Sequence, residues 1–244
     1  AILGMAETDK LAHAEAPGHG PLQEFMARMA REHKIWLIGG TIPLQAPEAG
    51  MPARLVSRWP KAAPHQFLDR AQYRYAIWVD GSLEVLSAAF VADMLAALRG
   101  QVIGAFPHPQ RECIYEEAQV CQPLQKYADY DLAGQVATYQ REGYPAQHGL
   151  PACTVLVWDL RHPRQAEAGN RWWAEQRQWG TMDQLALPVV LWRMGLGWAV
   201  LPGHLWRNPW FRLWEHQGAA RDELRLNLGC ADRMLEGFVN VDIT

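Results

Sequence analysis

The stretch Tyr73–Val85 (YRYAIWVDGSLEV) limits the fold of this chain more than any other. An apolar run ends at a single carboxylate, Asp80, and Gly81 then turns the chain towards polar residues. This pattern predicts a buried strand with Asp80 at its carboxyl end, the edge where open α/β sheets bind ligands. The carboxylate offers a hard oxygen to a divalent cation, and Gly81 lets the backbone approach a phosphate. An Asp-Gly turn that merely closes a strand explains the same residues without a ligand.

The segments that follow alternate between helical and strand patterns. Amphipathic spacing predicts helices over 88–98, 132–142 and 181–194, and apolar runs predict strands over 101–106 and 154–158. Strands that alternate with helices are typical of an α/β fold with a mainly parallel central sheet flanked by helices. We therefore expect that architecture.

The net charge, the cysteine spacing and the hydropathy limit the partners and the cellular compartment that we expect for this protein. The 244 residues carry a net charge of −3, which gives no basic excess for a nucleic-acid partner. No CxxC pair is present, and scattered thiols favour a reducing compartment; the four cysteines are Cys113, Cys121, Cys153 and Cys230. No apolar run approaches 18 residues, so we expect no transmembrane segment and a cytoplasmic location. The abrupt ends of the chain suggest a fragment of a longer protein.

Several motifs carry a family resemblance when they are taken in order. They are KAAPHQFL, YRYAIWVDGSLEV, AFPHPQRECIYEEA, YQREGYPAQHGLP, TVLVWD, NRWWAE and TMDQLAL. Over residues 54–216 they resemble the glycosyltransferase-like domain of the TOD/MUCI type. The resemblance implies a GT-A-like nucleotide-sugar-binding fold, placed here in a domain of residues 51–217. It also implies transfer of a sugar from a nucleotide-sugar donor to a hydroxyl acceptor on a glycan or polysaccharide.

The resemblance implies roles for two acidic residues and a histidine. Asp183 in TMDQ is the first choice for the catalytic carboxylate, as a base for the acceptor hydroxyl or as a partner of the donor sugar. Its place at a helix start also suits a purely structural N-cap. Asp80 matches the position where GT-A enzymes bind Mn²⁺ or Mg²⁺, although a second Asp is missing, and His216 is the candidate second ligand. A surface histidine is the alternative for His216.

The remaining site residues implied by the resemblance would contact the donor or the acceptor. Donor or substrate binding is expected for Asp80, Gly81, Lys61, His108, Arg111, His148, Gly149, Gln184 and Trp173. Arg111 and His108 suit phosphate oxygens, although Arg111 equally fits a surface pair with Glu112 or Glu116. Trp172 and Trp173 are adjacent on a predicted helix, so one is expected to face a sugar and the other the core.

The two flanks resemble other families. Residues 1–46 (notably GPLQEF and IWLIGGTIPL), in a unit of residues 1–50, are similar to part of the nitrilase or carbon–nitrogen hydrolase family, but the Glu-Lys-Cys triad of that family has no counterpart here. Residues 224–244, in a unit of residues 218–244, resemble the start of a class I methyltransferase that uses S-adenosylmethionine, and we expect no productive binding of that cofactor. The alternatives to a glycosyltransferase are a carbon–nitrogen hydrolase fragment and a non-catalytic sugar-binding module.

Overall fold

The computed structural model describes residues 51–213 except 81, 88 and 181, together with the backbone of residues 225–228 and 238–241 and residues 20, 24 and 28. The chain divides into two units, residues 45–214 and residues 1–44 with 215–244. In the second unit, the backbone of β7 (Arg225–Leu228) pairs in parallel with that of β8 (Phe238–Val241). Most of the nitrilase-like and methyltransferase-like stretches lies outside the described residues, so those two assignments and the domain boundaries stay predictions.

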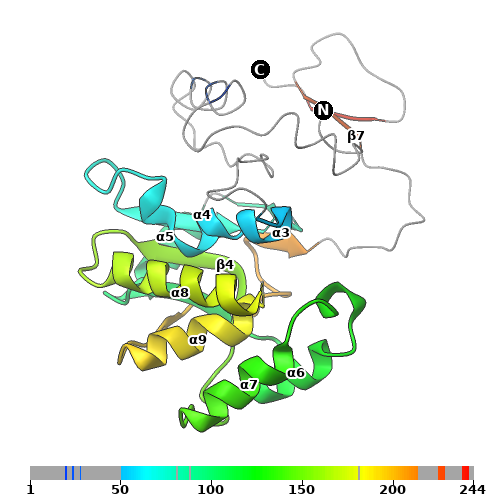
Figure 1. The fold of residues 1–244 in the computed structure, drawn as a ribbon. Coiled ribbons are helices and arrows are strands. Elements are labelled where there is room, and N and C mark those ends of the chain that lie inside the picture. The colour runs from blue at the N-terminus through cyan, green and yellow to red at the C-terminus, as the bar shows by residue number, and fades with distance from the viewer. Residues whose placement is uncertain are drawn as a thin grey trace. The chain divides into compact units, whose positions relative to one another are not determined.

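The larger unit is built on a four-stranded sheet (Figure 1). Its order is β1-β4-β3-β5, with bounds β1 (Tyr75–Val79), β4 (Pro151–Asp159), β3 (Ile103–Pro107) and β5 (Ala199–Val200). Strand β4 runs antiparallel to both β1 and β3, whereas β5 runs parallel to β3. The described sheet is therefore mixed and mostly antiparallel, and the expected mainly parallel sheet is not found.

The reason for this difference lies in β4. Strands β1, β3 and β5 do share one direction, as a chain of strand–helix–strand units predicts. Strand β4 inserts between β1 and β3 in the opposite direction, so two of the three pairings in the described sheet become antiparallel. Apolar periodicity places a strand in the core but carries no information on its neighbours.

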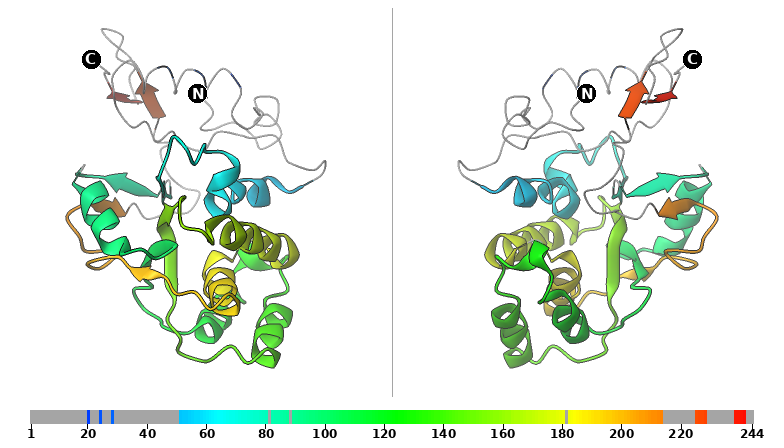
Figure 2. Two further views of the ribbon diagram at one scale, coloured as in Figure 1. Left: turned by 90° about the vertical axis from the view of Figure 1, so that its left-hand side faces the viewer. Right: turned by 90° about the vertical axis from the view of Figure 1, so that its right-hand side faces the viewer.

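Helices cover both faces of the sheet. Their bounds are α3 (Ala53–Val56), α4 (Trp59–Ala62), α5 (Phe90–Leu98), α6 (Ile114–Cys121), α7 (Leu132–Arg141), α8 (Gln165–Trp179) and α9 (Asp183–Arg193), with short 3₁₀ turns η1 (Pro64–Gln66) and η2 (Gln125–Tyr127). Figure 2 shows β4 between α5 on one side and α8 with α9 on the other. A two-stranded antiparallel sheet, β2 (Leu83–Val85) with β6 (Phe211–Leu213), lies beside α5 and adds to its side of the core.

The side-chain alternation of β4 explains the two-sided core. Leu156 and Trp158 pack in the cluster that includes buried residues of α8 and α9, whereas Val155 and Val157 pack with residues of α5 and β6. Successive residues of a strand point to opposite faces, so an unbroken apolar run fills both layers. Helices α6 and α7 pack with α9 in a third cluster. Among the described helices, none is long and apolar enough to cross a membrane.

Candidate functional site

Helix α4 brings Lys61 into the interior at the carboxyl end of β1. The indole Nε1 of Trp158 donates to the Lys61 carbonyl oxygen at 3.1 Å, which ties α4 to the central strand. On its other side, a Cβ at Gly169 of α8 would lie 2.8 Å from the Ala62 carbonyl oxygen. Only a glycine therefore lets α8 pack this closely on α4. The Lys61 side chain is 1% exposed as a result.

Lys61 bridges two aspartates that are 103 positions apart in the sequence. Its Nζ lies 2.7 Å from Asp183 Oδ2 and 3.2 Å from Asp80 Oδ1. Burial favours the neutral amine, but the carboxylates of Asp183 and Asp80 outweigh burial and raise the Lys61 pKa above its usual value. Lys61 is therefore an ammonium ion at neutral pH. We call Lys61, Asp80 and Asp183, with their neighbours Arg58, Trp78 and Gln176, the Lys61 cluster.

Asp183 is held on both of its oxygens. Gln176 Nε2 donates to Oδ1 at 2.8 Å, and Oδ2 accepts from Lys61 with Arg58 Nη1 at 3.5 Å. The side chain is only 7% exposed. Asp183 is also the first residue of α9, where the helix dipole favours a negative charge. These contacts fix the carboxylate but leave little of it open to a substrate.

Asp80 is the more accessible carboxylate of the two. Its Oδ1 accepts from Lys61 and from Trp78 Nε1 at 2.6 Å, while its Oδ2 has no hydrogen-bond partner among the described residues. The side chain is 24% exposed. The backbone amide of Asp80 still bonds to the Thr154 carbonyl at 2.8 Å, so the residue is anchored to β4. Asp80 thus combines a fixed position with one free oxygen.

Unsatisfied polar atoms surround these carboxylates. Arg58 Nε, Gln176 Oε1 and Thr154 Oγ1 are buried and have no hydrogen-bond partner in the described part of the chain. Arg58 and Gln176 both contact Asp183, and Thr154 is the backbone partner of Asp80. Buried polar groups normally have partners. Three such atoms around one cluster indicate a site that a bound polar molecule or water completes.

A second cluster follows β3 at the same sheet edge, and we call it the Arg111 cluster. Arg111 Nε donates to Glu117 Oε2, and the Arg111 amide donates to His108 Nδ1 at 3.1 Å. Glu117 is buried, whereas the surface-pair alternative named Glu112 or Glu116 as the partner of Arg111. Burial lowers the His108 pKa, the Glu117 carboxylate opposes this, and Arg111 adds to it, so the pKa lies below the usual value. His108 is therefore neutral at neutral pH.

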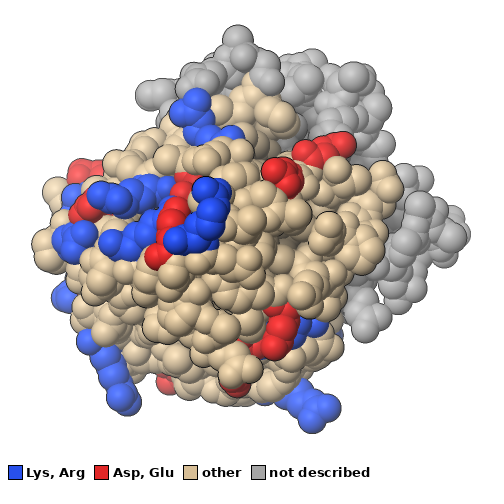
Figure 3. All heavy atoms as spheres, turned by 60° about the horizontal axis from the view of Figure 1, so that its bottom comes forward, with Lys and Arg blue, Asp and Glu red and all other residues tan. Residues whose placement is uncertain are grey.

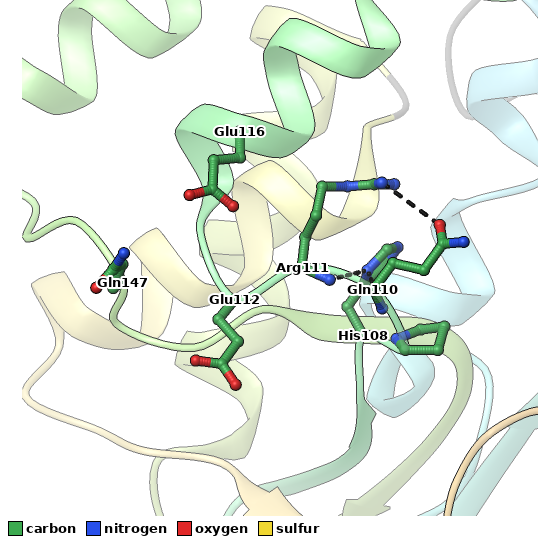
Figure 4. A pocket seen from close by; sticks show the side chains of 7 residues that line it. His108, Gln110, Arg111, Glu112, Glu116 and Gln147 are labelled. Carbon is green, nitrogen blue, oxygen red and sulfur yellow. Dashed lines mark hydrogen bonds between the residues drawn. The ribbon is translucent and has the colours of Figure 1, made fainter.

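An open pocket lies beside Arg111 (Figure 4). It has a volume of about 360 Å³. Its lining residues are His108, Pro109, Gln110, Arg111, Glu112, Glu116 and Gln147. Arg111 Nη1 donates to Gln110 Oε1 at 3.4 Å. The bonds from Nε to buried Glu117 and from Nη1 to Gln110 fix the orientation of the guanidinium at the side of the pocket where Gln110 lies (Figure 4).

Tyr127 of η2 connects the two clusters electrostatically. Burial, followed by Cys121, Asp183 and Glu117, raises the Tyr127 pKa to about 12 against the opposing effect of Arg58. The phenol is therefore within electrostatic range of both Asp183 and Glu117. It is protonated at neutral pH and can donate a hydrogen bond.

The other predicted site residues are spread more widely. His148 is exposed on the loop before β4, 5.6 Å from Tyr144 in an edge-to-face contact, and Gly149 has a φ of +84°. Gln184 is half-buried in the first turn of α9. Trp173 is 8% exposed and stacks on Trp59 at 6.1 Å, so it packs in the core together with Trp172, and the expectation that one of the two faces a sugar has no support. Gly81 and His216 lie outside the described residues.

Sequence reasoning missed three residues of the Lys61 cluster, namely Arg58, Trp78 and Gln176, and it also missed Tyr127. Only their spacing in the sequence could have pointed to the site. Arg58 precedes Lys61 by three positions, and Gln176 precedes Asp183 by seven. Those spacings gain meaning only after α4, α8 and α9 pack together.

Basic and acidic side chains are mixed on the face of the molecule that Figure 3 shows. On the described part of the face in Figure 3, basic side chains lie beside acidic ones and form no broad basic patch. On α8, for example, Glu167 pairs with Arg164 at 2.7 Å and with Arg171 at 3.0 Å. The expected absence of a nucleic-acid partner stays a prediction.

The described residues do not fit the expected divalent metal. No group of three His, Cys, Asp or Glu side chains within residues 51–213, with the gaps given above, could hold a metal ion. Asp80 and Asp183 are close together, but both bind the Lys61 ammonium. The ammonium occupies one oxygen of each carboxylate, so a metal ion that bridges the two aspartates would compete with Lys61.

A comparison with known proteins identifies a family for this chain. The family described as "TOD1/MUCI70, glycosyltransferase-like domain" matches residues 51–201, which include both clusters. No curated protein matches the chain. The match covers more than half of the sequence, so the chain belongs to the TOD1/MUCI70 glycosyltransferase-like family.

Proposed function

We propose that the domain of residues 51–217 is a glycosyltransferase that moves a sugar from a nucleotide-sugar donor to a hydroxyl group of a glycan or polysaccharide. Membership of a glycosyltransferase-like family supports the general class, with a sugar donor and an acceptor as partners. The observation that carries the proposal is the meeting of Lys61, Asp80 and Asp183 at the end of β1, where one oxygen of Asp80 has no partner among the described residues.

Asp80 is the proposed contact with the reacting molecules. Its Oδ2 has no hydrogen-bond partner among the described residues, and the Asp80 side chain is partly exposed. Asp183 was the first choice from sequence, but Gln176 and Lys61 occupy both of its oxygens. Asp183 is therefore proposed to position Lys61, and through Lys61 to position Asp80.

The Arg111 cluster is proposed to bind the donor diphosphate. Glu117 engages Nε of Arg111, and Gln110 accepts a long bond of 3.4 Å from Nη1. We propose that the outer N–H groups of the guanidinium bind two phosphate oxygens, with the anion replacing Gln110. The His108 imidazole and the Tyr127 phenol are both uncharged at neutral pH. Each can therefore donate one hydrogen bond without adding a charge. We propose that the sugar lies between Arg111 and Asp80.

The proposed transfer breaks one bond of the donor and forms one bond to the acceptor. The bond between the anomeric carbon and the phosphate oxygen breaks, and a bond forms between that carbon and the acceptor oxygen. The acceptor hydroxyl passes its proton to Asp80 Oδ2, as in general base catalysis. The nucleoside diphosphate leaves with the electron pair of the broken bond, and Arg111 stabilises that charge.

Release of nucleoside diphosphate tests the proposal. The protein is incubated with a panel of nucleotide sugars, with and without glycan fragments, and released diphosphate is measured. Asp80→Asn should lower kcat by about 10²-fold or more, as expected for loss of a general base. Asp129→Asn, at an exposed position, is the matched control. Donor binding without release would favour a non-catalytic sugar-binding module, and neither binding nor release would refute the proposal.

The carbon–nitrogen hydrolase alternative needs a reactive thiolate. Cys113, Cys121 and Cys153 are buried. Burial and then Glu117 raise the Cys121 pKa to about 12, and burial with Asp183 raises that of Cys153. Thiols with raised pKa values are poor nucleophiles at neutral pH. Within the described residues, Cys121 and Cys153 therefore do not support that chemistry, and Cys113 is buried away from solvent.

A further inference from the structure

The Lys61 cluster already contains its own cation. Lys61 Nζ lies 2.7 Å from Asp183 Oδ2 and 3.2 Å from Asp80 Oδ1, at the sheet edge where the family resemblance implies a divalent metal. With Arg58 3.5 Å from Asp183, two positive charges balance two negative ones. The described cluster is thus electrically complete without an added ion.

We infer that Lys61 replaces the divalent metal ion at this site, so that the domain binds its nucleotide-sugar donor independently of metal. The inference rests on the proposed function for the nature of the donor. A metal ion could reach both carboxylates only by displacing Lys61. That ammonium is buried, and the side-chain acceptors that it has in the described residues are these two carboxylates. A displaced and unpaired buried charge is strongly unfavourable.

Without a metal ion, the phosphates of the donor must be bound by side chains whose positions are fixed. Arg111, already oriented by Glu117, supplies a permanent positive charge beside an open pocket. A guanidinium keeps its charge at all physiological pH values. In this arrangement Lys61 positions the two carboxylates, and Arg111 binds the diphosphate leaving group.

Binding of Mn²⁺ alone is the first test. The loss of free Mn²⁺ signal in electron paramagnetic resonance is followed for the wild-type protein, Asp80→Asn and the control Asp129→Asn. We expect no tight site in the wild type and no effect of Asp80→Asn. A single Mn²⁺ site that Asp80→Asn weakens by about tenfold or more would overturn the inference.

Removal of Lys61 gives the converse test. In Lys61→Met the two carboxylates lose their shared cation, and we expect Mn²⁺ affinity to rise and to fall again in Lys61→Met/Asp80→Asn. If Lys61→Met folds and gains no Mn²⁺ binding, then Lys61 does not stand where a metal ion would bind. If it does not fold, the wild-type and Asp80→Asn titrations still decide.

Binding of uridine and guanosine diphosphates separates this inference from the proposed function. Titration calorimetry is carried out in Mn²⁺ and in EDTA. Affinities equal within about twofold in the two buffers support metal independence, and an affinity lost in EDTA overturns it. Absence of binding in both buffers counts against the proposed function, while the Mn²⁺ titration still reports on Lys61.

Discussion

Replacement of Lys61 by methionine should destabilise the fold strongly. Methionine keeps the length of the side chain but removes the charge, so the carboxylates of Asp80 and Asp183 lose their shared partner. Deleting one partner of a buried ion pair costs about 3–5 kcal/mol. We expect the lower end, about 3 kcal/mol, because Arg58 remains near Asp183 and Asp80 is partly exposed. For a domain of this size that loss lowers Tm by roughly 6–12 °C.

Urea denaturation followed by tryptophan fluorescence measures this loss. Lys126→Met, at an exposed lysine, is the control and should change the free energy of unfolding by less than about 0.5 kcal/mol. In Lys61→Met/Asp183→Asn one of the unpaired carboxylates is gone, so the double variant should lose less than the sum of the two single variants. If Lys61→Met unfolds at the same urea concentration as the wild type, the ion pairs do not hold this part of the domain.

The pH dependence provides an independent check. The Lys61 pKa is raised in the folded protein, so its contribution to stability is complete below the usual lysine value of 10.5 and is lost as the pH rises through the folded pKa. The stability difference between wild type and Lys61→Met should therefore stay constant from neutral pH to about pH 10 and shrink above it. A difference that vanishes near neutral pH would contradict a charged Lys61.

Three further predictions follow from single contacts. Gly169→Ala places a Cβ 2.8 Å from the Ala62 carbonyl oxygen and should cost about 1–3 kcal/mol in thermal denaturation, because α4 must move away from α8. Glu117→Gln removes the charge that orients Arg111, and calorimetry should show weaker binding of a nucleoside diphosphate by about tenfold. Asp131→Ala deletes the N-cap of α7 and should cost about 1 kcal/mol in urea.

Matched variants control these three changes. Gly197→Ala meets only Gln101 Oε1 at 3.8 Å and should be nearly neutral, so equal losses at both glycines would refute the close packing of α8 on α4. Glu112→Gln lines the same pocket without contacting Arg111 in the described contacts and should bind as the wild type does. Asp129→Ala, two positions before the cap, should leave stability unchanged, and a loss equal to that of Asp131→Ala would rule out the capping role.

Local sequence was sufficient for the elements on which the site depends. The apolar run before Asp80 predicted β1 and a carboxylate at its end, and the amphipathic spacing of 132–142 and 181–194 predicted α7 and α9 within one to two residues. These features come from side-chain periodicity, which a short segment carries by itself. The ordered motifs also predicted the family that the comparison confirms over residues 51–201.

Strand neighbours and charge partners were decided by the tertiary structure. The direction of β4 depends on how the chain returns to the sheet after α6 and α7, and no local pattern records that path. Lys61, Asp80 and Asp183 are individually ordinary polar residues, and only the packing of α4 between β4 and α8 brings them within hydrogen-bond distance. The sequence by itself thus determined a strand-end carboxylate and its family. The fold decided that Asp80 and Asp183 share the buried Lys61. The contact between Lys61 and Asp183 spans more than a hundred residues and exists only after the core has formed.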